Sequence, residues 1–265
     1  MMLFRLVLAT CIGLAGAHPQ HHSRKIMGGV EAEPGEIPYI VSLGNYAYPP
    51  PLNWHVCGGV LISPTAVLTA AHCGANFAPE DVFARAGSLS VVEGGITANV
   101  TSIHNHPLYN KTAVLDHDIG IWQLSEPIAE GPDISYAELP AQGSDPEPGE
   151  MTTSSGWGLQ VLDEWVLAEK LRKVDLPIVS REKCTTLYEG FRIGVTENMI
   201  CAGDEEGGKS VCSGDSGGPA VDSSGVLVGL ASWVGTCGVF DDPGVYTRVG
   251  NYIEWIADTI SKWSV

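Results

Sequence analysis

Gly214-Asp215-Ser216-Gly217-Gly218-Pro219 is the stretch of this sequence that decides most about its fold and its chemistry. It places one serine between an acid and two glycines, shortly after Cys212. Glycines let the backbone turn tightly and aim its N–H groups outward. A nucleophile for acyl transfer needs such a turn, because the tetrahedral intermediate carries an oxyanion that hydrogen-bond donors must meet. The hexapeptide alone would also fit a plain glycine-rich turn.

Two upstream motifs supply the partners that a serine nucleophile requires. Thr69-Ala70-Ala71-His72-Cys73 contains a histidine beside a cysteine, and Asp118-Ile119-Gly120-Ile121 contains an aspartate at the start of an apolar run. A hydroxyl is a poor nucleophile at neutral pH, so a neutral imidazole must take its proton. A carboxylate on the other ring nitrogen holds that imidazole in one tautomer. The order His72, Asp118, Ser216 is the order of a chymotrypsin-type triad.

On these motifs the chain resembles the trypsin/chymotrypsin family of serine proteases, from Ile26 to the C-terminus. The family pattern at the aspartate favours Asp118 over Asp116, a rival carboxylate two residues earlier. The resemblance implies a serine endopeptidase in which Ser216 attacks the peptide carbonyl, His72 transfers the proton and Asp118 orients His72. It also implies an oxyanion hole made by the backbone N–H groups of Gly214 and Ser216.

A non-catalytic homologue that acts as a binding module is the alternative from another class of function. Such homologues usually replace a triad residue or a glycine of the nucleophile loop. This chain keeps all of them, so the sequence favours the enzyme.

The composition predicts an all-β fold. The 265 residues include 32 glycines and 17 prolines, apolar runs are short and helical periodicity is scarce. The resemblance implies two six-stranded antiparallel β-barrels, the first over about 26–140 and the second over about 150–250, with 141–150 as the linker. A helix is expected over about 251–262, because residues 252, 253, 256 and 260 have helical spacing. The resemblance implies that it is the family's closing helix, with Trp255 or its neighbours packed against the second barrel.

The first 25 residues are expected to lie outside that fold. Leu6 to Ala17 form a short apolar run that ends in Ala15-Gly16-Ala17, which is typical of a signal peptide over 1–17. The run is too short to span a bilayer, and no later segment resembles a transmembrane helix. We therefore expect a secreted, extracellular protein with a propeptide over 18–25.

Ile26-Met27-Gly28-Gly29 resembles the family's mature N-terminus. In that family the new ammonium group folds inward and pairs with the aspartate before the nucleophile, here Asp215. A buried carboxylate without a partner costs several kcal/mol. The resemblance therefore implies a zymogen that a trypsin-like protease activates by cutting after Lys25.

The cysteines indicate disulfides. Cys11 leaves with the signal peptide, and six remain, whose pairing the sequence alone leaves open. The resemblance implies Cys57–Cys73, Cys184–Cys201 and Cys212–Cys237. Zinc is disfavoured because no C-x-x-C pattern is present. Calcium is disfavoured because the segment 90–98 offers one carboxylate, Glu93. We expect no metal and no cofactor.

The formal net charge of −17 argues against nucleic acid and anionic membranes as partners. Expected partners are protein and peptide substrates, the activating trypsin-like protease and protein inhibitors, with a monomer as the default state. Asn99-Val100-Thr101 and Asn110-Lys111-Thr112 are sequons for N-glycosylation.

The pocket residues predict an apolar specificity. Many local strings resemble secreted trypsins of filamentous fungi, yet Ser210 stands six residues before the nucleophile, where trypsins carry the aspartate that binds lysine or arginine. A buried cationic side chain would lack a counter-ion there. The resemblance implies that Val211 adds apolar surface near the pocket floor and that Gly244 leaves one wall open. Val234 stands where the family usually has glycine, and it is expected to narrow the entrance. The resemblance completes the substrate-binding set with Ser213, Ser232 and Trp233, the last on a strand that pairs with the substrate backbone.

We expect a chymotrypsin/elastase-like preference for medium or large apolar side chains, such as Leu or Met, with Phe and Tyr accepted and Ala or Val weaker. Two alternatives remain open. Loop shifts around Gly235 could turn Val234 outward and restore an aromatic preference. Asp241 or Asp242 could lean into the pocket and give broad or residual trypsin-like cleavage.

Overall fold

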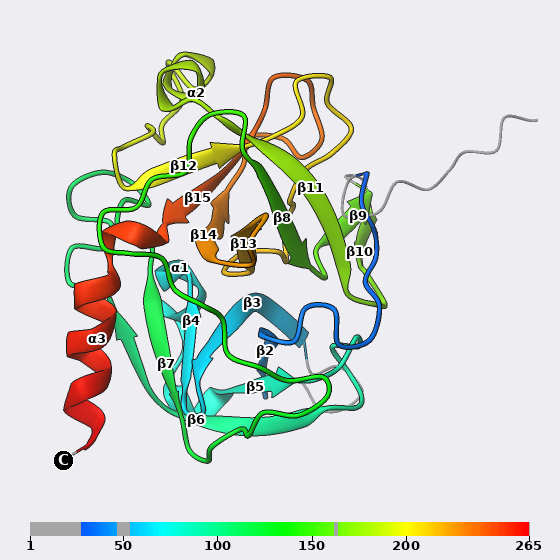
Figure 1. Cartoon of the computed structure of the whole chain (residues 1–265), viewed down its shortest axis with the longest axis vertical. Helices are drawn as coiled ribbons and strands as arrows, with labels where there is room; N and C mark the ends of the chain where they lie inside the picture. The colour runs from blue at the N-terminus through cyan, green and yellow to red at the C-terminus, as the bar shows by residue number, and fades with distance from the viewer. Residues whose placement is uncertain (1–27, 47–53, 162–163, 265) are drawn as a thin grey trace, which may run out of the picture.

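The computed structural model describes residues 28–46, 54–161 and 164–264, and it consists mainly of antiparallel strands (Figure 1). The predicted all-β architecture of two six-stranded barrels with a C-terminal helix is confirmed. In the first barrel the strands follow one another around a closed ring in the order β2 (Ile40–Asn45), β3 (Trp54–Ser63), β4 (Ala66–Thr69), β7 (Gly120–Leu124), β6 (Ile96–Asn105) and β5 (Val82–Ala86).

The second barrel closes because β8 pairs with both β11 and β13. Its ring runs β8 (Met151–Gly156), β11 (Arg172–Val179), β12 (Met199–Ala202), β15 (Gly244–Arg248), β14 (Leu227–Trp233) and β13 (Pro219–Asp222). The short strand β1 (Val30–Glu31) pairs with β11 of this barrel, although it precedes the first barrel in sequence. A small hairpin, β9 (Leu159–Val161) and β10 (Glu164–Leu167), lies at the edge of the second barrel (Figure 1).

Helices are few and short among the described residues. They are α1 (Ala71–Gly74), α2 (Arg181–Leu187) and α3 (Ile253–Ser261), with single 3₁₀ turns η1 (Pro79–Asp81), η2 (Val249–Asn251) and η3 (Lys262–Ser264). Ser180 caps α2 by accepting a hydrogen bond from the backbone N–H of Lys183, as an N-cap serine is expected to do.

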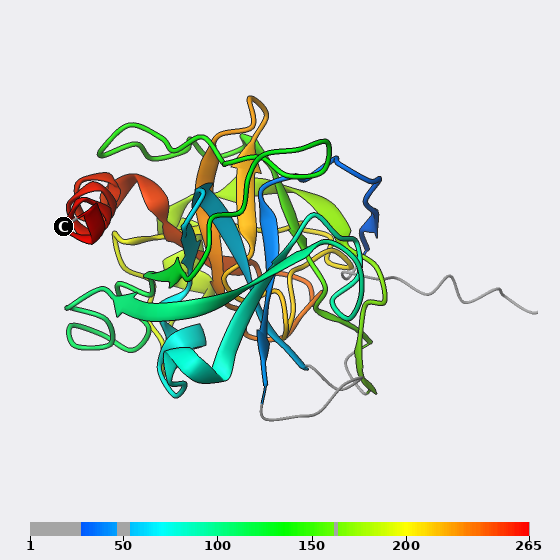
Figure 2. The same cartoon turned by 90° about the horizontal axis from the view of Figure 1, so that it is seen from below.

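Each barrel encloses its own apolar core, and a third core lies between them. Val41, Leu61 and Trp122 are fully buried inside the first barrel, and Leu176 and Tyr246 are fully buried inside the second. The third core combines side chains of both barrels and of the C-terminal segment, among them Val60, Leu68, Ile119, Leu230 and Ile256. The barrels are therefore fixed against each other, and loops at their junction have defined positions (Figures 1 and 2).

The position of α3 differs from the prediction. The helix was expected to pack on the second barrel. Its Ile256 joins the core that both barrels share, but the helix runs down beside β7 of the first barrel (Figure 1). The Trp255 ring lies 5.1 Å from His106, and the Trp263 ring lies 5.4 Å from His104, measured between ring centroids. Helical spacing of apolar residues identifies the buried face of a helix but not the surface that covers it, which explains the error.

The three predicted disulfides, Cys57–Cys73, Cys184–Cys201 and Cys212–Cys237, are confirmed. The first ties the loop of His72 to β3, and the third ties the nucleophile loop to the segment after β14. Each bridge restricts the unfolded chain and so stabilises the fold.

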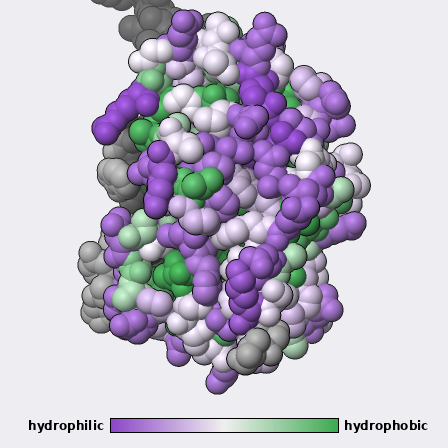
Figure 3. All heavy atoms as spheres, turned by 90° about the vertical axis from the view of Figure 1, so that its left-hand side faces the viewer, coloured by the Kyte–Doolittle hydropathy of each residue, from purple (hydrophilic) through white to green (hydrophobic). Residues whose placement is uncertain are grey.

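No helix among the described residues is long and apolar enough to cross a membrane. The face that carries α3 is mostly polar, with small separate apolar patches (Figure 3). Isolated apolar patches of this kind are usual on protein surfaces.

Candidate active site

His72 and Asp118 meet where the two barrels join. His72 lies in α1, directly after β4, and Asp118 lies two residues before β7. The His72 Nδ1 atom is 2.7 Å from Asp118 Oδ2, and the His72 backbone N–H donates to Asp118 Oδ1 at 2.9 Å. The Asp118 side chain is completely buried, whereas 27% of the His72 side chain is exposed. A carboxylate at Nδ1 keeps the proton on that nitrogen and leaves Nε2 free to act as a base.

The second barrel supplies two further hydrogen bonds to Asp118. Ser232 Oγ donates to its carboxylate at 2.5 Å, and Thr247 Oγ1 donates to its backbone carbonyl at 2.7 Å. Buried charges need such partners. Ser232 was among the predicted site residues. Thr247 was not, because a lone threonine on a distant strand carries no sequence signal.

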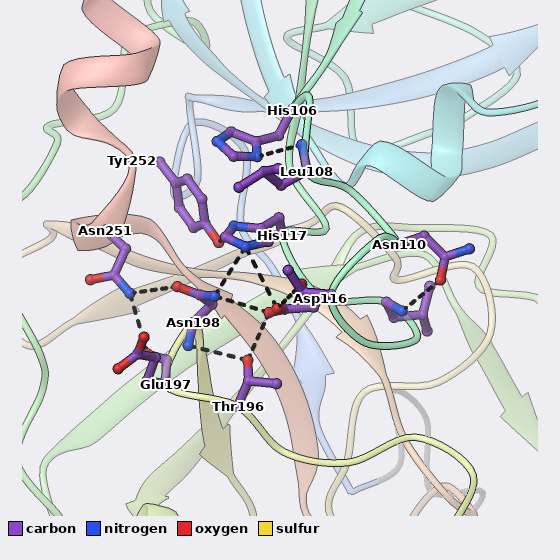
Figure 4. Close-up of polar contacts among 12 residues, drawn as sticks. His106, Leu108, Asn110, Asp116, His117, Thr196, Glu197, Asn198, Asn251 and Tyr252 are labelled. Carbon is purple, nitrogen blue, oxygen red and sulfur yellow. Dashed lines mark hydrogen bonds and ion pairs between the residues drawn. The ribbon is translucent and has the colours of Figure 1, made fainter.

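Asp116, the rival carboxylate, binds Thr196 and Asn198, which precede β12 of the second barrel (Figure 4). Its Oδ1 accepts hydrogen bonds from Thr196 Oγ1 at 2.8 Å and Asn198 Nδ2 at 3.0 Å, and its Oδ2 accepts one from Thr112 Oγ1 at 2.5 Å. Burial opposes ionisation of Asp116, but these hydrogen bonds lower its pKa below the ordinary value. Asp116 therefore links the two barrels as a carboxylate.

His117, between the two aspartates, has the left-handed backbone angle φ of 53°. Such a φ is uncommon outside glycine. The His117 ring stacks on His106 with centroids 4.8 Å apart, and its Nδ1 lies 3.1 Å from the Tyr252 hydroxyl (Figure 4). The backbone N–H of Ile119 donates to the His117 carbonyl at 2.8 Å across Asp118. The packed ring thus holds the turn that presents Asp118.

The nucleophile loop is pressed against the end of β4. Gly58 N donates to the Ser216 carbonyl at 2.8 Å, and Gly217 N donates to Ala231 O at 2.7 Å. Gly217 has φ of 75°, and a Cβ atom there would lie 2.1 Å from Thr69 Oγ1. Only glycine fits this contact. It brings Ser216, which is half-buried, to the same junction as His72.

Asp215 is completely buried. Its carboxylate accepts hydrogen bonds from Gly158 N at 2.7 Å and Cys212 N at 2.9 Å. Burial raises its pKa to about 6, although these two hydrogen bonds act in the opposite direction. Its predicted partner in the activated protein, Ile26, lies outside the described residues.

Gly156-Trp157-Gly158 forms the cradle of Asp215. A Cβ atom on either glycine would lie 2.2 or 2.4 Å from an oxygen of that carboxylate. The Trp157 indole donates to Leu89 O at 2.7 Å and fixes the segment. The sequence marked Trp157 as structural, and it did not reveal that the flanking glycines touch Asp215.

His55 is a residue of the site that the sequence did not reveal. It is buried on β3, with Nδ1 2.8 Å from Ser42 Oγ and Nε2 2.7 Å from the Gly214 carbonyl. Burial lowers its pKa to about 4, so the ring is neutral at pH 7. Since a carbonyl only accepts, Nε2 carries the proton and Nδ1 accepts from Ser42. His55 therefore fixes the peptide group between Gly214 and Asp215.

A cavity of about 170 Å³ opens beside Ser216. It is lined by Val211, Cys212, Ser213, Ser216, Ala231, Ser232, Trp233 and Val234, which include most of the predicted substrate-binding residues. Ser210 is buried next to it and donates to the Val211 carbonyl at 2.8 Å. Gly244 packs against the side chain of Val211, since a Cβ atom on Gly244 would lie 2.8 Å from Val211 Cγ2.

The described residues contain one grouping of metal-binding side-chain types, made by Cys57, His72 and Cys73. Both cysteines are joined in a disulfide and cannot act as thiolate ligands. This grouping therefore does not fit a metal ion.

Both predicted glycosylation residues are exposed. Asn99 lies on β6 and accepts a hydrogen bond from the Tyr46 hydroxyl at 2.6 Å. Asn110 lies in the loop between β6 and β7, and its side chain accepts a hydrogen bond from Leu115 N at 3.1 Å.

Comparison with known proteins gives one consistent result. The sequence model of the family described as Trypsin matches residues 26–256. The chain is 40% identical to "Trypsin Blo t 3" of Blomia tropicalis over 87% of this chain and 84% of the relative. It is 38% identical to "Anionic trypsin" of Canis lupus familiaris, over 97% of this chain and 98% of the relative. It is 37% identical to "Trypsin" of Squalus acanthias, over 90% of this chain and 97% of the relative.

Proposed function

Because the chain belongs to the trypsin family of serine proteases and is a serine endopeptidase, we propose that it is secreted, activated by proteolysis and selective for peptide bonds that follow apolar side chains. The burial of Asp215 supports the activation, and the lining of the cavity beside Ser216 supports the selectivity.

The reaction uses Ser216, His72 and Asp118 as nucleophile, base and orienting carboxylate. His72 Nε2 takes the hydroxyl proton while Ser216 Oγ bonds to the substrate carbonyl carbon. The tetrahedral intermediate then expels the amine, which receives that proton from His72. Water then attacks the carbonyl carbon of the acyl-enzyme while His72 Nε2 takes its proton. The second tetrahedral intermediate expels Ser216 Oγ, which receives that proton, and the acid is released. The 2.7 Å contact between His72 Nδ1 and Asp118 supports these roles.

The backbone N–H groups of Gly214 and Ser216 stabilise the oxyanion. Support comes from His55, which binds the carbonyl of Gly214 and so limits rotation of the loop. Donors fixed before the reaction cost no reorganisation when charge develops.

Activation follows cleavage between Lys25 and Ile26. The new ammonium group of Ile26 pairs with Asp215 and sets the nucleophile loop. Support comes from the burial of Asp215 and its pKa of about 6, because a cation beside this carboxylate would stabilise its charged form.

The apolar preference rests on one observation, the lining of the cavity beside Ser216. None of its described lining residues carries a charge, and Ser210 stands where trypsins have the pocket aspartate. A lysine or arginine side chain would enter this pocket without a counter-ion. Leu, Met and larger apolar side chains fit its chemistry, with Val234 limiting the entrance.

Trypsin-like cleavage after basic residues is the second candidate, because the relatives named above are called trypsins. The partners proposed are protein and peptide substrates, an activating trypsin-like protease and protein inhibitors, and the enzyme is proposed to act as a monomer outside the cell. Asn99 and Asn110 are proposed to carry glycans, in keeping with their exposure.

The test compares turnover of succinyl-blocked peptide p-nitroanilides that end in Arg, Phe, Leu or Ala. The zymogen is first activated with trypsin, which is then removed, and cleavage after Lys25 is verified by mass spectrometry. Preference for Leu or Phe over Arg is expected. Preference for Arg would refute the apolar specificity, and absence of turnover in verified enzyme would favour the binding-module alternative.

A further inference from the structure

The Asp242 carboxylate joins two loops at the entrance of the pocket. Asp242 lies just before β15, and it accepts hydrogen bonds from the backbone of the segment after β14. Gly235 N donates to Oδ1 at 3.1 Å, and Thr236 N donates to Oδ2 at 2.5 Å. We call this arrangement, together with the Tyr188 hydroxyl described next, the Asp242 clasp.

Tyr188 extends the clasp to α2. Its hydroxyl oxygen lies 2.5 Å from Asp242 Oδ1 and 2.5 Å from the Pro243 carbonyl, so its proton lies between two acceptors. The side chain is buried, and its ring lies 4.6 Å from that of Trp233. Burial and the neighbouring Asp242 raise the pKa of Tyr188 well above its ordinary value. The hydroxyl therefore stays protonated and donates at any working pH.

Gly235 is the point where the clasp touches the pocket wall. A Cβ atom there would lie 2.7 Å from both carboxylate oxygens of Asp242, so the backbone rests directly on the carboxylate. Val234, the preceding residue, lines the cavity. The disulfide Cys212–Cys237 closes the same segment from its other end.

We propose that Asp242 is a positioning residue for substrate selection. By binding the backbone of Gly235 and Thr236 it holds Val234 at the pocket entrance, and so sets which side chains enter. This inference rests on the proposed function through the role of Val234, and it goes beyond it by naming what fixes that residue.

A different role for Asp242, as counter-ion for a basic substrate side chain, conflicts with these contacts. Its carboxylate already meets two backbone N–H groups and one hydroxyl. Turning it into the pocket would break these three hydrogen bonds, and the hydroxyl of the buried Tyr188 would lose one of its two acceptors, which is unfavourable.

The experiment measures kcat/KM of the activated enzyme and of the variants Asp242→Ala, Asp242→Asn and Tyr188→Phe. The substrates are p-nitroanilides that differ only in their last residue, Ala, Leu, Phe or Arg, and active-site titration corrects for misfolded enzyme. Without the clasp Val234 is free to move outward. Asp242→Ala should therefore raise the Phe-to-Leu ratio by about 10-fold, the lower end of what a small change in an apolar pocket gives.

The other variants grade the effect. Asp242→Asn keeps one carbonyl oxygen for a backbone N–H, so its ratio should fall between wild type and Asp242→Ala. Tyr188→Phe keeps both backbone contacts and should move the ratio in the same direction by less. It also keeps the proposal testable if Asp242→Ala fails to fold. Turnover of the Ala substrate should change little, because the nucleophile loop is untouched.

Asp241→Asn is the matched control, because it removes an equal charge one residue away. Its left-handed φ of 55° suits asparagine, and its ratios should equal those of wild type. Unchanged Phe-to-Leu ratios in all clasp variants would overturn the proposal, as would a selective loss of Arg cleavage in Asp242→Asn. A wild-type preference for Arg would refute the apolar specificity, while the clasp would still be judged by the shift in the Phe-to-Leu ratio.

Discussion

The two carboxylates that flank His117 have different surroundings, and this difference separates their roles. Asp118 contacts His72 and Ser232, whereas Asp116 binds residues that link the barrels. From the sequence only a family pattern distinguished them, since both are aspartates beside a histidine.

Asparagine substitution should therefore affect the two positions differently. Asp118→Asn should lower kcat about 10,000-fold, because the amide favours the wrong tautomer of His72. Asp116→Asn should keep kcat within about tenfold but reduce the free energy of unfolding by roughly 1–3 kcal/mol, since its buried donors lose an acceptor. Steady-state kinetics with active-site titration and urea unfolding check both. Comparable losses of kcat in the two variants would show that the assignment is wrong.

Ser210 is the residue on which the proposed apolar specificity chiefly rests. Ser210→Asp should raise the ratio of Arg to Leu cleavage, because a hydrogen-bonded charge at the pocket floor contributes about 1.5–3 kcal/mol, or roughly 10- to 100-fold. The ratio of kcat/KM on the two p-nitroanilides measures it, and Ser210→Asn is the control of equal size without charge. An unchanged ratio would mean that the pocket floor lies elsewhere.

At the scale of elements, the sequence and its resemblance predicted the architecture, whereas the partners of single polar residues stayed hidden. The triad motifs, the barrels and the disulfides followed from the sequence and its resemblance. The contacts of His55, Thr247 and Asp242 could not be predicted, because each is a single polar residue whose partners lie on another strand or loop. The surface that α3 packs on was also not predicted correctly, since helical periodicity identifies the buried face of a helix but not the surface that covers it.

The Gly156-Trp157-Gly158 cradle gives a prediction at this scale. Gly158→Ala would bring a Cβ atom to 2.4 Å from the Asp215 carboxylate, so the nucleophile loop must shift. We expect kcat to fall by about 100-fold or more, the effect of losing one oxyanion donor. Gly131→Ala is the control, because no atom lies within 4 Å of a Cβ atom there. Activity of Gly158→Ala close to that of Gly131→Ala would contradict the role of the cradle.

For the whole molecule, buried ionisable groups set the response of stability to pH. His55 has its pKa lowered from 6.5 to about 4, so the unfolded chain binds the proton more readily than the folded one. Its contribution is fully present above pH 6.5 and is lost as the pH falls toward 4. Asp215, with its pKa raised to about 6, acts in the opposite direction in the uncleaved chain.

The variant His55→Gln tests how much His55 contributes to the pH dependence of stability. The wild-type free energy of unfolding should fall between pH 7 and pH 4.5, and the variant should fall by less. The change in the pKa of His55 from 6.5 to about 4 corresponds to roughly 3 kcal/mol of unfolding free energy at most. Urea unfolding of both proteins at the two pH values, with disulfides intact, measures the difference. Equal acid sensitivity would show that His55 does not carry it.

The most direct test of the account is to map the cleavage sites of the activated enzyme on a denatured protein by mass spectrometry. The proposed uncharged pocket predicts that most cuts follow Leu, Met, Phe or Tyr, and that they persist in the presence of an inhibitor that blocks residual trypsin. Cuts confined to positions after Lys and Arg would contradict it.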